Sequence, residues 1–504
     1  MTFARELSRN QSDKPAIVIP DGFQLSYRQL NAVVGQFRAD LAALGLGKRQ
    51  FVSISLANGI EFVVAFLAAT ASGHIAAPLN PAYRQSEFEF YIEDCQSKLI
   101  LVPKGSVAAN YAAIAAADKF GAAVAEVWWD GSKVRIEVAR GAVGSPQAVQ
   151  DAEADDTCFV LHTSGTTGRP KAVPLLHRNM AATVANIIGT YSLTESDASY
   201  LVMPLFHVHG LLCGLLAALG SGGTVIVPAK FSATVFWDHF ARYGATWYTA
   251  VPTIHQILLK SKIPAPVPPI RFIRSCSSSL APATFAQLEA TFGAPVVEAY
   301  AMTEACHQMS SNSLPPGKRK PGTVGVGHGV TIVILDSQGN QLPQGTEGEI
   351  AVRGANVTPG YLNNPKANAE AFSNGFFRTG DQGKFDEDAM LVITGRIKEL
   401  INRGGEKISP IELDGVLLSH PAVAEAVVYG APDPKYGEQV NAVVVLRDGH
   451  AASEQELKDF VAAKVAAFKV PVRISFTAVM PKTATGKIQR RVIAAQFAAP
   501  KAKI

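Results

Sequence analysis

Apolar residues alternate between two spacings over the first hundred residues, and this alternation limits the fold more than any other feature of the chain. A helical spacing runs from Leu30 to Leu44, begins after a capping box formed by Ser26 and Gln29, and stops at Gly45. The next predicted elements are strands at 51–56, near 75 and at 99–103, and helices at 61–69 and 87–94. Helices and strands in this order predict an α/β protein with layered sheets.

The length of 504 residues exceeds what one hydrophobic core normally serves, so at least two domains are expected. After about residue 315, short strands separated by Gly-rich turns predict a β-rich subdomain. Beyond Gly395 and Arg396 the pattern changes to a small α+β lobe. The predicted architecture is therefore a large N-terminal α/β domain (1–395) that includes the β-rich part, and a C-terminal lobe (396–504).

Charge and apolar patterning exclude several classes of protein. The net charge is 46 − 42 = +4 and the charges are interspersed, whereas a nucleic-acid-binding surface needs clustered basic residues. The N-terminus lacks the apolar core of a signal peptide. The most apolar stretch, 210–227, is interrupted by glycines, and this favours a buried helix and strand over a membrane span.

Cysteine usage and the C-terminus bear on the compartment. Five cysteines lie far apart without a Cys-x-x-Cys pair, which predicts buried thiols in a reducing compartment such as the cytoplasm. The final Ala-Lys-Ile faintly resembles the Ser-Lys-Leu peroxisomal address, although a solvated basic tail is the favoured interpretation. The sequence does not predict an oligomeric state.

The segment TSGTTGRPK, residues 163–171, has the composition of a phosphate-binding loop but is not a Walker loop. Pro170 stands where a Walker loop has glycine, and Ala172 lacks the hydroxyl that would bind magnesium. Strand-like residues flank the segment on both sides, so a strand-loop-strand turn is expected. Its hydroxyls, amides and cations suit a polyphosphate that other parts of the protein hold.

This loop and six later motifs resemble the family of adenylate-forming enzymes, which includes acyl-CoA synthetases, luciferases and peptide-synthetase adenylation domains. The resemblance covers nearly the whole chain and is specific in order and spacing. The later motifs are MPLFHVHG (203–210), YAMTE (300–304), YLNNP (361–365), RTGD (378–381), GRIKELINRGGEKISPIE (395–412) and PKTATGK (481–487). The resemblance implies a mobile C-terminal lobe with a hinge near Lys398, and activation of a carboxylic acid by ATP as acyl-AMP.

The resemblance also implies the roles of individual residues. Lys487 would bridge the substrate carboxylate and the α-phosphate, where a compact point charge is suitable. Glu304 would bind Mg²⁺. Asp381 would accept from the ribose hydroxyls, Arg396 would reach the ribose or a phosphate, and adenine would pack on Tyr300. Glu298 and Ala299 would also belong to the nucleotide site. Gly404 and Gly405 would let the pantetheine arm of CoA pass, although a plain turn explains them too. The phosphate-binding residues would be Thr163, Ser164, Gly165, Thr166, Thr167, Gly168, Lys171 and Thr303.

The expected acid is small and polar. Ala301 replaces a glycine that is usual in the family, and its methyl group is expected to shorten the acyl pocket. Ser277, Ser279, His207 and His307 are the candidate acid-binding residues. A second carboxylate buried beside the first would cost several kcal/mol unless it is hydrogen-bonded or paired.

The segments RSCSSSLAP (274–282) and EAYAMTEA (298–305), followed by a histidine, resemble the oxalate-CoA ligase branch of plants and fungi. Oxalate is therefore the expected acid, with ATP and CoA as co-substrates and no nucleic-acid partner. A malonate or short- to medium-chain fatty acid ligase and a stand-alone enzyme that loads a carrier protein stay open as alternatives. The polar residues could also be satisfied core groups.

Overall fold

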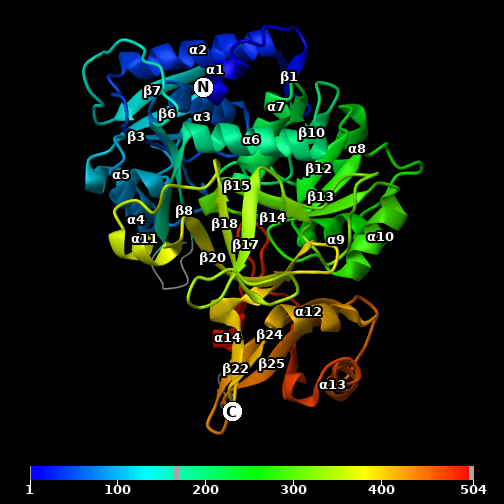
Figure 1. Ribbon diagram of the computed structural model, residues 1–504. Coiled ribbons are helices and arrows are strands. Elements are labelled where there is room, and N and C mark those ends of the chain that lie inside the picture. Colours follow the sequence, from blue (N-terminus) through cyan, green and yellow to red (C-terminus); the bar gives the residue numbers. More distant parts are fainter. Residues whose placement is uncertain (1, 164–169, 499–504) are drawn as a thin grey trace.

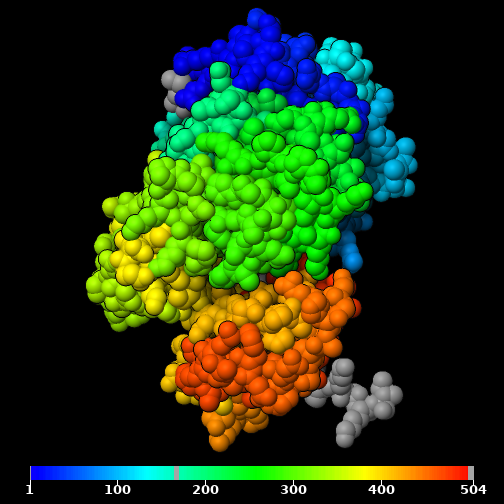
Figure 2. Space-filling view, turned by 90° about the vertical axis from the view of Figure 1, so that its right-hand side faces the viewer, coloured from blue at the N-terminus to red at the C-terminus, as the bar shows by residue number. Residues whose placement is uncertain are grey.

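The computed structural model describes residues 2–163 and 170–498. A large lobe holds three sheets and most of the helices, and a small lobe lies below it (Figure 1). The surface narrows where the two lobes meet (Figure 2). Among the described residues, no helix combines the length and the apolar character that a membrane crossing requires.

The first sheet of the large lobe has nine strands in the order β16-β15-β14-β13-β12-β10-β11-β1-β2. Its centre is parallel, whereas β15 and β2 run antiparallel to their neighbours β14 and β1. The strands are β1 (Pro15–Val18), β2 (Gln24–Ser26), β10 (Ala198–Tyr200), β11 (Thr224–Ile226), β12 (Trp247–Ala250), β13 (Phe272–Cys276), β14 (Val296–Met302), β15 (His307–Ser311) and β16 (Val326–Gly327).

The second sheet has seven strands in the order β7-β6-β5-β3-β4-β8-β9. Its last pair, β8 and β9, is antiparallel with Thr163 opposite Lys171, so the two strands predicted on either side of the loop are confirmed. The strands are β3 (Phe51–Ile54), β4 (Ile75–Pro78), β5 (Leu99–Pro103), β6 (Ala123–Trp129), β7 (Val134–Arg140), β8 (Thr157–Thr163) and β9 (Lys171–Leu176).

Two five-stranded sheets complete the fold, one in each lobe. The predicted β-rich part of the large lobe is formed by β17 (Val330–Leu335), β18 (Gly348–Gly354), β19 (Phe372–Ser373), β20 (Phe376–Phe385) and β21 (Leu391–Arg396). The small lobe contains β22 (Ile401–Arg403), β23 (Glu406–Ile408), β24 (Val423–Asp433), β25 (Gly437–Leu446) and β26 (Arg473–Phe476).

Helices cover and separate these sheets. In the large lobe they are α1 (Phe3–Leu7), α2 (Tyr27–Ala43), α3 (Ile60–Ala71), α4 (Gln85–Cys95), α5 (Ala112–Phe120), α6 (His177–Tyr191), the π-helix η1 (His209–Ala217), α7 (Ala218–Gly220), α8 (Phe236–Arg242), α9 (Pro252–Lys260), α10 (Pro282–Phe292), η2 (Thr303–Ala305) and α11 (Pro365–Ala371). The small lobe adds η3 (Ile397–Glu399), α12 (Pro410–Leu418), α13 (Glu454–Ala462), η4 (Ala467–Lys469) and α14 (Arg490–Ala498).

The largest core joins the nine-stranded and seven-stranded sheets. Helix α3 is buried along almost its whole surface, as expected for a helix that is apolar on all sides. Helix α2 begins at the predicted Ser26 and Gln29 capping box. The apolar stretch after residue 209 is a buried π-helix followed by α7 and β11, and all five cysteines are free and buried, as predicted.

Candidate active site

Side chains from one half of the nine-stranded sheet gather around a fully buried arginine. Arg274, on β13, donates from Nε to the Tyr191 hydroxyl at 2.7 Å. Its Nη1 donates to Thr249 Oγ1 on β12 at 3.1 Å, and its Nη2 to Gln308 Oε1 on β15 at 3.2 Å. These partners are neutral. Burying a cation without a carboxylate partner costs free energy. Within the described residues, the site therefore has an unpaired positive charge that a bound anion can neutralise.

Two histidines lie against this guanidinium. The His209 Nε2 atom lies 3.5 Å from Arg274 Nη1 and 2.6 Å from Thr249 Oγ1, and its Nδ1 lies 3.2 Å from Ser277 Oγ. The His307 ring stacks on His209, with centroids 5.3 Å apart. Burial and the nearby cation lower the pKa of both histidines well below the usual range, so both rings are neutral.

His307 has the features of a side chain that can bind a ligand. It is fully buried, yet neither ring nitrogen has a hydrogen-bond partner among the described residues. Its backbone has φ +97°, directly after Cys306 at φ +49°. Two consecutive non-glycine residues in the left-handed region are strained, and such strain often occurs at functional sites.

Lys487 and His207 lie close to this cluster. Burial, with Lys487 nearby, lowers the pKa of His207 to about 3. Burial also lowers the pKa of Lys487, and no described carboxylate forms an ion pair with its ammonium group. The lysine is therefore brought close to the histidine cluster although it lies near the end of the chain.

The residues predicted for the ribose and adenine are also brought together. Asp381 faces Arg396 across β20 and β21, and Arg396 Nε donates to Asp381 Oδ1 at 2.9 Å. The other carboxylate oxygen accepts from the Tyr300 hydroxyl at 2.5 Å. Burial raises the pKa of the Tyr300 phenol well above its usual range, so it remains a donor. Asp381 is thereby held as a fixed acceptor beside the Tyr300 ring.

Glu304 fits the predicted binding of magnesium. Its carboxylate is buried and accepts from the Tyr361 hydroxyl at 2.9 Å. Burial raises the pKa of this carboxyl, so a cation beside it would offset the cost of its charge. Lys171 Nζ lies 4.5 Å from the centre of the Tyr361 ring, which brings the end of the phosphate loop to the same place. One hard oxygen near a phosphate loop suits Mg²⁺, which keeps few protein ligands.

The other predicted residues are placed in different ways. Glu298 and Ala299 are buried on β14, and the Glu298 carboxylate accepts from the backbone of Leu280 and Gly322. Thr303 begins η2, and Ala301 pairs with Gln308 across β15. Ser279 is exposed and has no hydrogen bond to the histidine cluster among the described residues. The predicted Ser164, Gly165, Thr166, Thr167 and Gly168, and the C-terminal address, lie outside the described residues.

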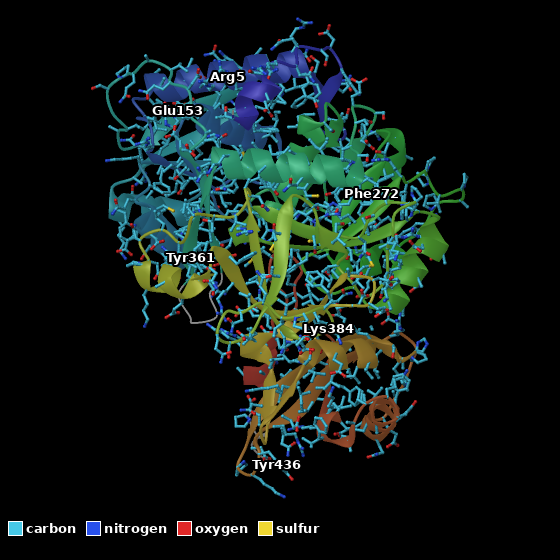
Figure 3. All side chains as sticks on the ribbon, in the orientation of Figure 1. Arg5, Glu153, Phe272, Tyr361, Lys384 and Tyr436 are labelled. Atoms are coloured by element: carbon cyan, nitrogen blue, oxygen red, sulfur yellow. The ribbon has the colours of Figure 1, made fainter. Side chains whose placement is uncertain are left out.

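Gly404 and Gly405 form the tight turn between β22 and β23, where both have positive φ. Gly404 N donates to the Tyr436 carbonyl, and Tyr436 lies at the far tip of the small lobe, away from Tyr361 and Lys384 (Figure 3). In this arrangement the two glycines do not meet the nucleotide residues. Lys398 lies in η3, which follows Arg396 at the start of the small lobe.

Arg274 and His209 are the residues that the sequence reasoning missed. Arg274 begins the segment RSCSSSLAP and His209 lies in MPLFHVHG, but the sequence predicts only serines and His207 of these segments as acid-binding residues. The arginine in the middle of the strand FIRSC (272–276) was the available signal, because a strand of that composition is buried and a buried arginine needs a partner.

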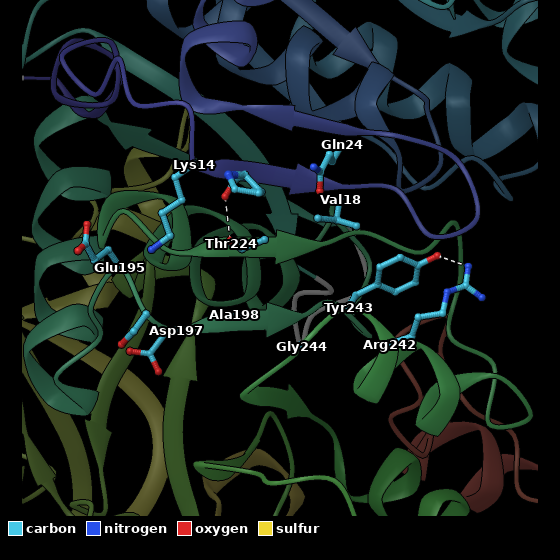
Figure 4. A pocket seen from close by; sticks show the side chains of 12 residues that line it. Lys14, Val18, Gln24, Glu195, Asp197, Ala198, Thr224, Arg242, Tyr243 and Gly244 are labelled. Carbon is cyan, nitrogen blue, oxygen red and sulfur yellow. Dashed lines mark hydrogen bonds between the residues drawn. The ribbon is translucent and has the colours of Figure 1, made fainter.

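A separate surface depression of about 360 Å³ lies over β1, β10 and β11 (Figure 4). Two of its polar groups already have partners: Asp197 pairs with Arg271 at 3.0 Å, and the Tyr243 hydroxyl accepts from Arg242 at 2.6 Å. The site residues of β13 to β15 lie in the other half of the same sheet. The depression therefore has no part in the site.

Comparisons with known proteins agree with this geometry. The family model described as AMP-binding enzyme matches residues 3–362, and its C-terminal domain model matches residues 412–487. An oxalate–CoA ligase of Saccharomyces cerevisiae is 51% identical, over 97% of this chain and 95% of that protein. An oxalate–CoA ligase of Arabidopsis thaliana is 49% identical, over 96% of each chain. The ATP-bound crystal structure of MatB from Rhodopseudomonas palustris has a TM-score of 0.89 at 31% identity, over 99% of each chain.

Proposed function

Since the chain belongs to the AMP-binding enzyme family, we propose that it is an oxalate–CoA ligase that forms AMP and pyrophosphate. A carboxylate oxygen of oxalate attacks the α-phosphorus of ATP and releases pyrophosphate. The thiol of CoA then attacks the acyl carbon and releases AMP. The reactants of both steps are anions or poor electrophiles. The protein must therefore neutralise negative charge at the place where the reacting groups meet.

The observation that carries the choice of acid is the buried Arg274, which has no carboxylate partner among the described residues and lies beside His209. A monocarboxylic acid would leave this guanidinium unneutralised in the acyl region. Oxalate brings a second carboxylate that is bonded directly to the first. Arg274 and His307, beside the fixed ring of His209, would hold that second carboxylate through charge-assisted hydrogen bonds.

The same arrangement orients the reacting carboxylate. Lys487, close to the cluster, would lie between that carboxylate and the α-phosphate and offset the charge that accumulates there. Asp381, held by Tyr300 and Arg396, would accept from the ribose hydroxyls. Glu304 would hold Mg²⁺, which neutralises the phosphate charge when bound.

A panel of acids tests the proposal directly. Oxalate, malonate, succinate, sulfoacetate, acetate and hexanoate are each incubated with ATP, Mg²⁺ and CoA, and AMP is measured. We expect oxalate to give a kcat/KM at least about 100-fold above acetate, because acetate leaves the buried cation unpaired. Greater activity with acetate or hexanoate than with oxalate would contradict the proposal, and so would ADP as the product.

A further inference from the structure

The turn that carries Lys487 is a closed unit of the small lobe. Thr483 N donates to the Lys487 carbonyl at 2.8 Å, and Lys487 N donates to Thr483 Oγ1 at 3.1 Å. Flanking it, Lys482 and Ile488 form an antiparallel bridge. The turn therefore holds its own shape. The turn must also be held in position against the large lobe, because Lys487 has to reach the reacting groups there.

A hydroxyl of the large lobe contacts the tip of this turn. Thr253, the second residue of α9, donates from Oγ1 to the Gly486 carbonyl at 3.2 Å. The bond joins the two lobes one residue before Lys487. Gly486 has φ +83°, and a β-carbon there would lie 2.9 Å from Thr253 Oγ1 and 3.2 Å from Val251 Cγ2. The turn thus approaches α9 so closely that only glycine fits.

Thr253 is rigidly linked to the acid-binding cluster. It follows β12, whose Thr249 hydroxyl lies 2.6 Å from His209 Nε2 and accepts from Arg274. The four-residue step from Thr249 to Thr253 therefore contains one contact to the acid cluster and one to the lysine turn. This short connection sets the distance between the bound acid and Lys487.

From this geometry we infer that Thr253 is a positioning residue for Lys487. Its hydroxyl donates a hydrogen bond to the Gly486 carbonyl, and this bond places the lysine correctly for the step that releases pyrophosphate. This inference rests on the proposed function, in which the later attack by CoA does not use Lys487. That step therefore does not need the hydrogen bond between Thr253 and Gly486. A misplacement of about 1 Å at a reacting group can cost about 100-fold in rate, so one hydrogen bond at this point matters.

The test separates the two steps in a rapid-mixing experiment. Enzyme, ATP, Mg²⁺ and oxalate are mixed without CoA, and pyrophosphate is measured in a single turnover. CoA is then added to the enzyme-bound adenylate, and thioester formation is measured. Thr253→Val removes the donor and keeps the shape of the side chain, whereas Thr253→Ser keeps the donor. Gly486→Ala tests the same contact from the other lobe.

We expect Thr253→Val to slow pyrophosphate formation about three- to tenfold, the range for loss of one hydrogen bond, and to change thioester formation less than about twofold. Thr253→Ser should retain at least about half of the wild-type rate, and Gly486→Ala should lose about tenfold or more in the first step only. Equal slowing of both steps by Thr253→Val, or an unchanged first step, would overturn the inference. If the wild type releases no pyrophosphate with oxalate, the proposed function has failed, and the variants are compared with an acid that the wild type activates.

Discussion

The rings of His209 and His307 lie stacked with an interplanar angle of 25°, and only His209 has hydrogen-bond partners among the described residues. Thr249 and Ser277 hold the His209 ring, so this ring has a fixed orientation beside His307. His307 has two unused nitrogens in a fully buried place. The difference between two stacked rings identifies His307 as the one that is free to bind a ligand.

Replacement of His307 by Ala should therefore affect the acid and not the nucleotide. We expect KM for oxalate to rise about tenfold, because one charge-assisted hydrogen bond is lost, and KM for ATP to change less than about twofold. Steady-state AMP release at varied oxalate and varied ATP measures both constants. His307→Asn keeps an N–H donor and should recover part of the loss. An unchanged KM for oxalate would remove His307 from the acid site.

Arg274 should contribute more than His307 to the binding of oxalate. Replacement by Met removes the buried cation, and we expect kcat/KM for oxalate to fall about 100-fold or more while KM for ATP stays within about threefold. The comparison is Arg242→Met, an arginine of α8 that pairs with Asp21 and contacts no residue of the Arg274 cluster among the described residues. That control should change kcat/KM for oxalate by less than about twofold. Equal effects of the two variants would contradict an acid-binding role for Arg274.

The large-scale fold follows from the sequence because each element carries its own local signal. The capping box at Ser26 defines the start of α2, and the apolar runs on either side of the phosphate loop define β8 and β9. These signals need only a few neighbouring residues. The sequence therefore predicts the α/β layers, the β-rich part and the existence of a small lobe.

The cluster around Arg274 could not be predicted in the same way. Thr249, Arg274 and His307 come from three strands, and their meeting depends on the strand order of the nine-stranded sheet. The π-helix that begins at His209 is also invisible to periodicity, since helical spacing alone does not distinguish its wider turn. Motif resemblance identified His307 and Ser277, and only the geometry identified Arg274 and His209.

Gly210 tests whether the π-helix positions His209. A β-carbon at residue 210 would lie 2.3 Å from the Pro204 carbonyl oxygen and 2.7 Å from that of Met203, so the start of the helix would have to move. We expect Gly210→Ala to lower kcat/KM for oxalate about tenfold and to destabilise the protein by about 1 to 3 kcal/mol. At Gly189, on α6, an added β-carbon would meet no described atom within 4 Å. Gly189→Ala should keep full activity and stability, and a similar loss in both variants would contradict a local effect.

Buried neutral histidines predict loss of stability in acid. Burial lowers the pKa of His177 from 6.5 to about 4, so the unfolded chain binds a proton that the folded chain excludes. The contribution of this group is therefore present above pH 6.5 and is lost as the pH falls towards 4. The loss amounts to about 1.4 kcal/mol per pH unit in this window. Urea unfolding at pH 7.5, 6 and 5 measures it.

Replacement of His177 by Gln should lower stability at pH 7.5 but make it less dependent on pH between 6 and 5. His450 is exposed, and His450→Gln should leave the slope of unfolding free energy against pH unchanged. A slope that is equal in the wild type and in His177→Gln would contradict this assignment.

Arg490 should hold the small lobe together. It donates to the Asp414 carboxylate at 2.7 Å, to Glu399 at 3.2 Å and to the Val428 carbonyl, and thereby ties α14 to η3, α12 and β24. Burial raises the pKa of Asp414, so this carboxyl depends on its cationic partner. Arg490→Met should destabilise the lobe by about 3 to 5 kcal/mol at pH 8, because it leaves a buried charge unpaired. The loss should be smaller at pH 5, where Asp414 can take up a proton at lower cost.

The measurement has to be specific to the small lobe, since all four tryptophans lie before residue 395. Hydrogen exchange of peptides from β24 and β25 reports on this lobe, and tryptophan fluorescence reports on the large one. The neighbouring Arg491 is exposed, so Arg491→Met is the matched control and should leave exchange unchanged. Faster exchange in Arg490→Met that is confined to the small lobe would support the role of Arg490. Exchange equal to that of Arg491→Met would show that Asp414 and Glu399 do not need this arginine.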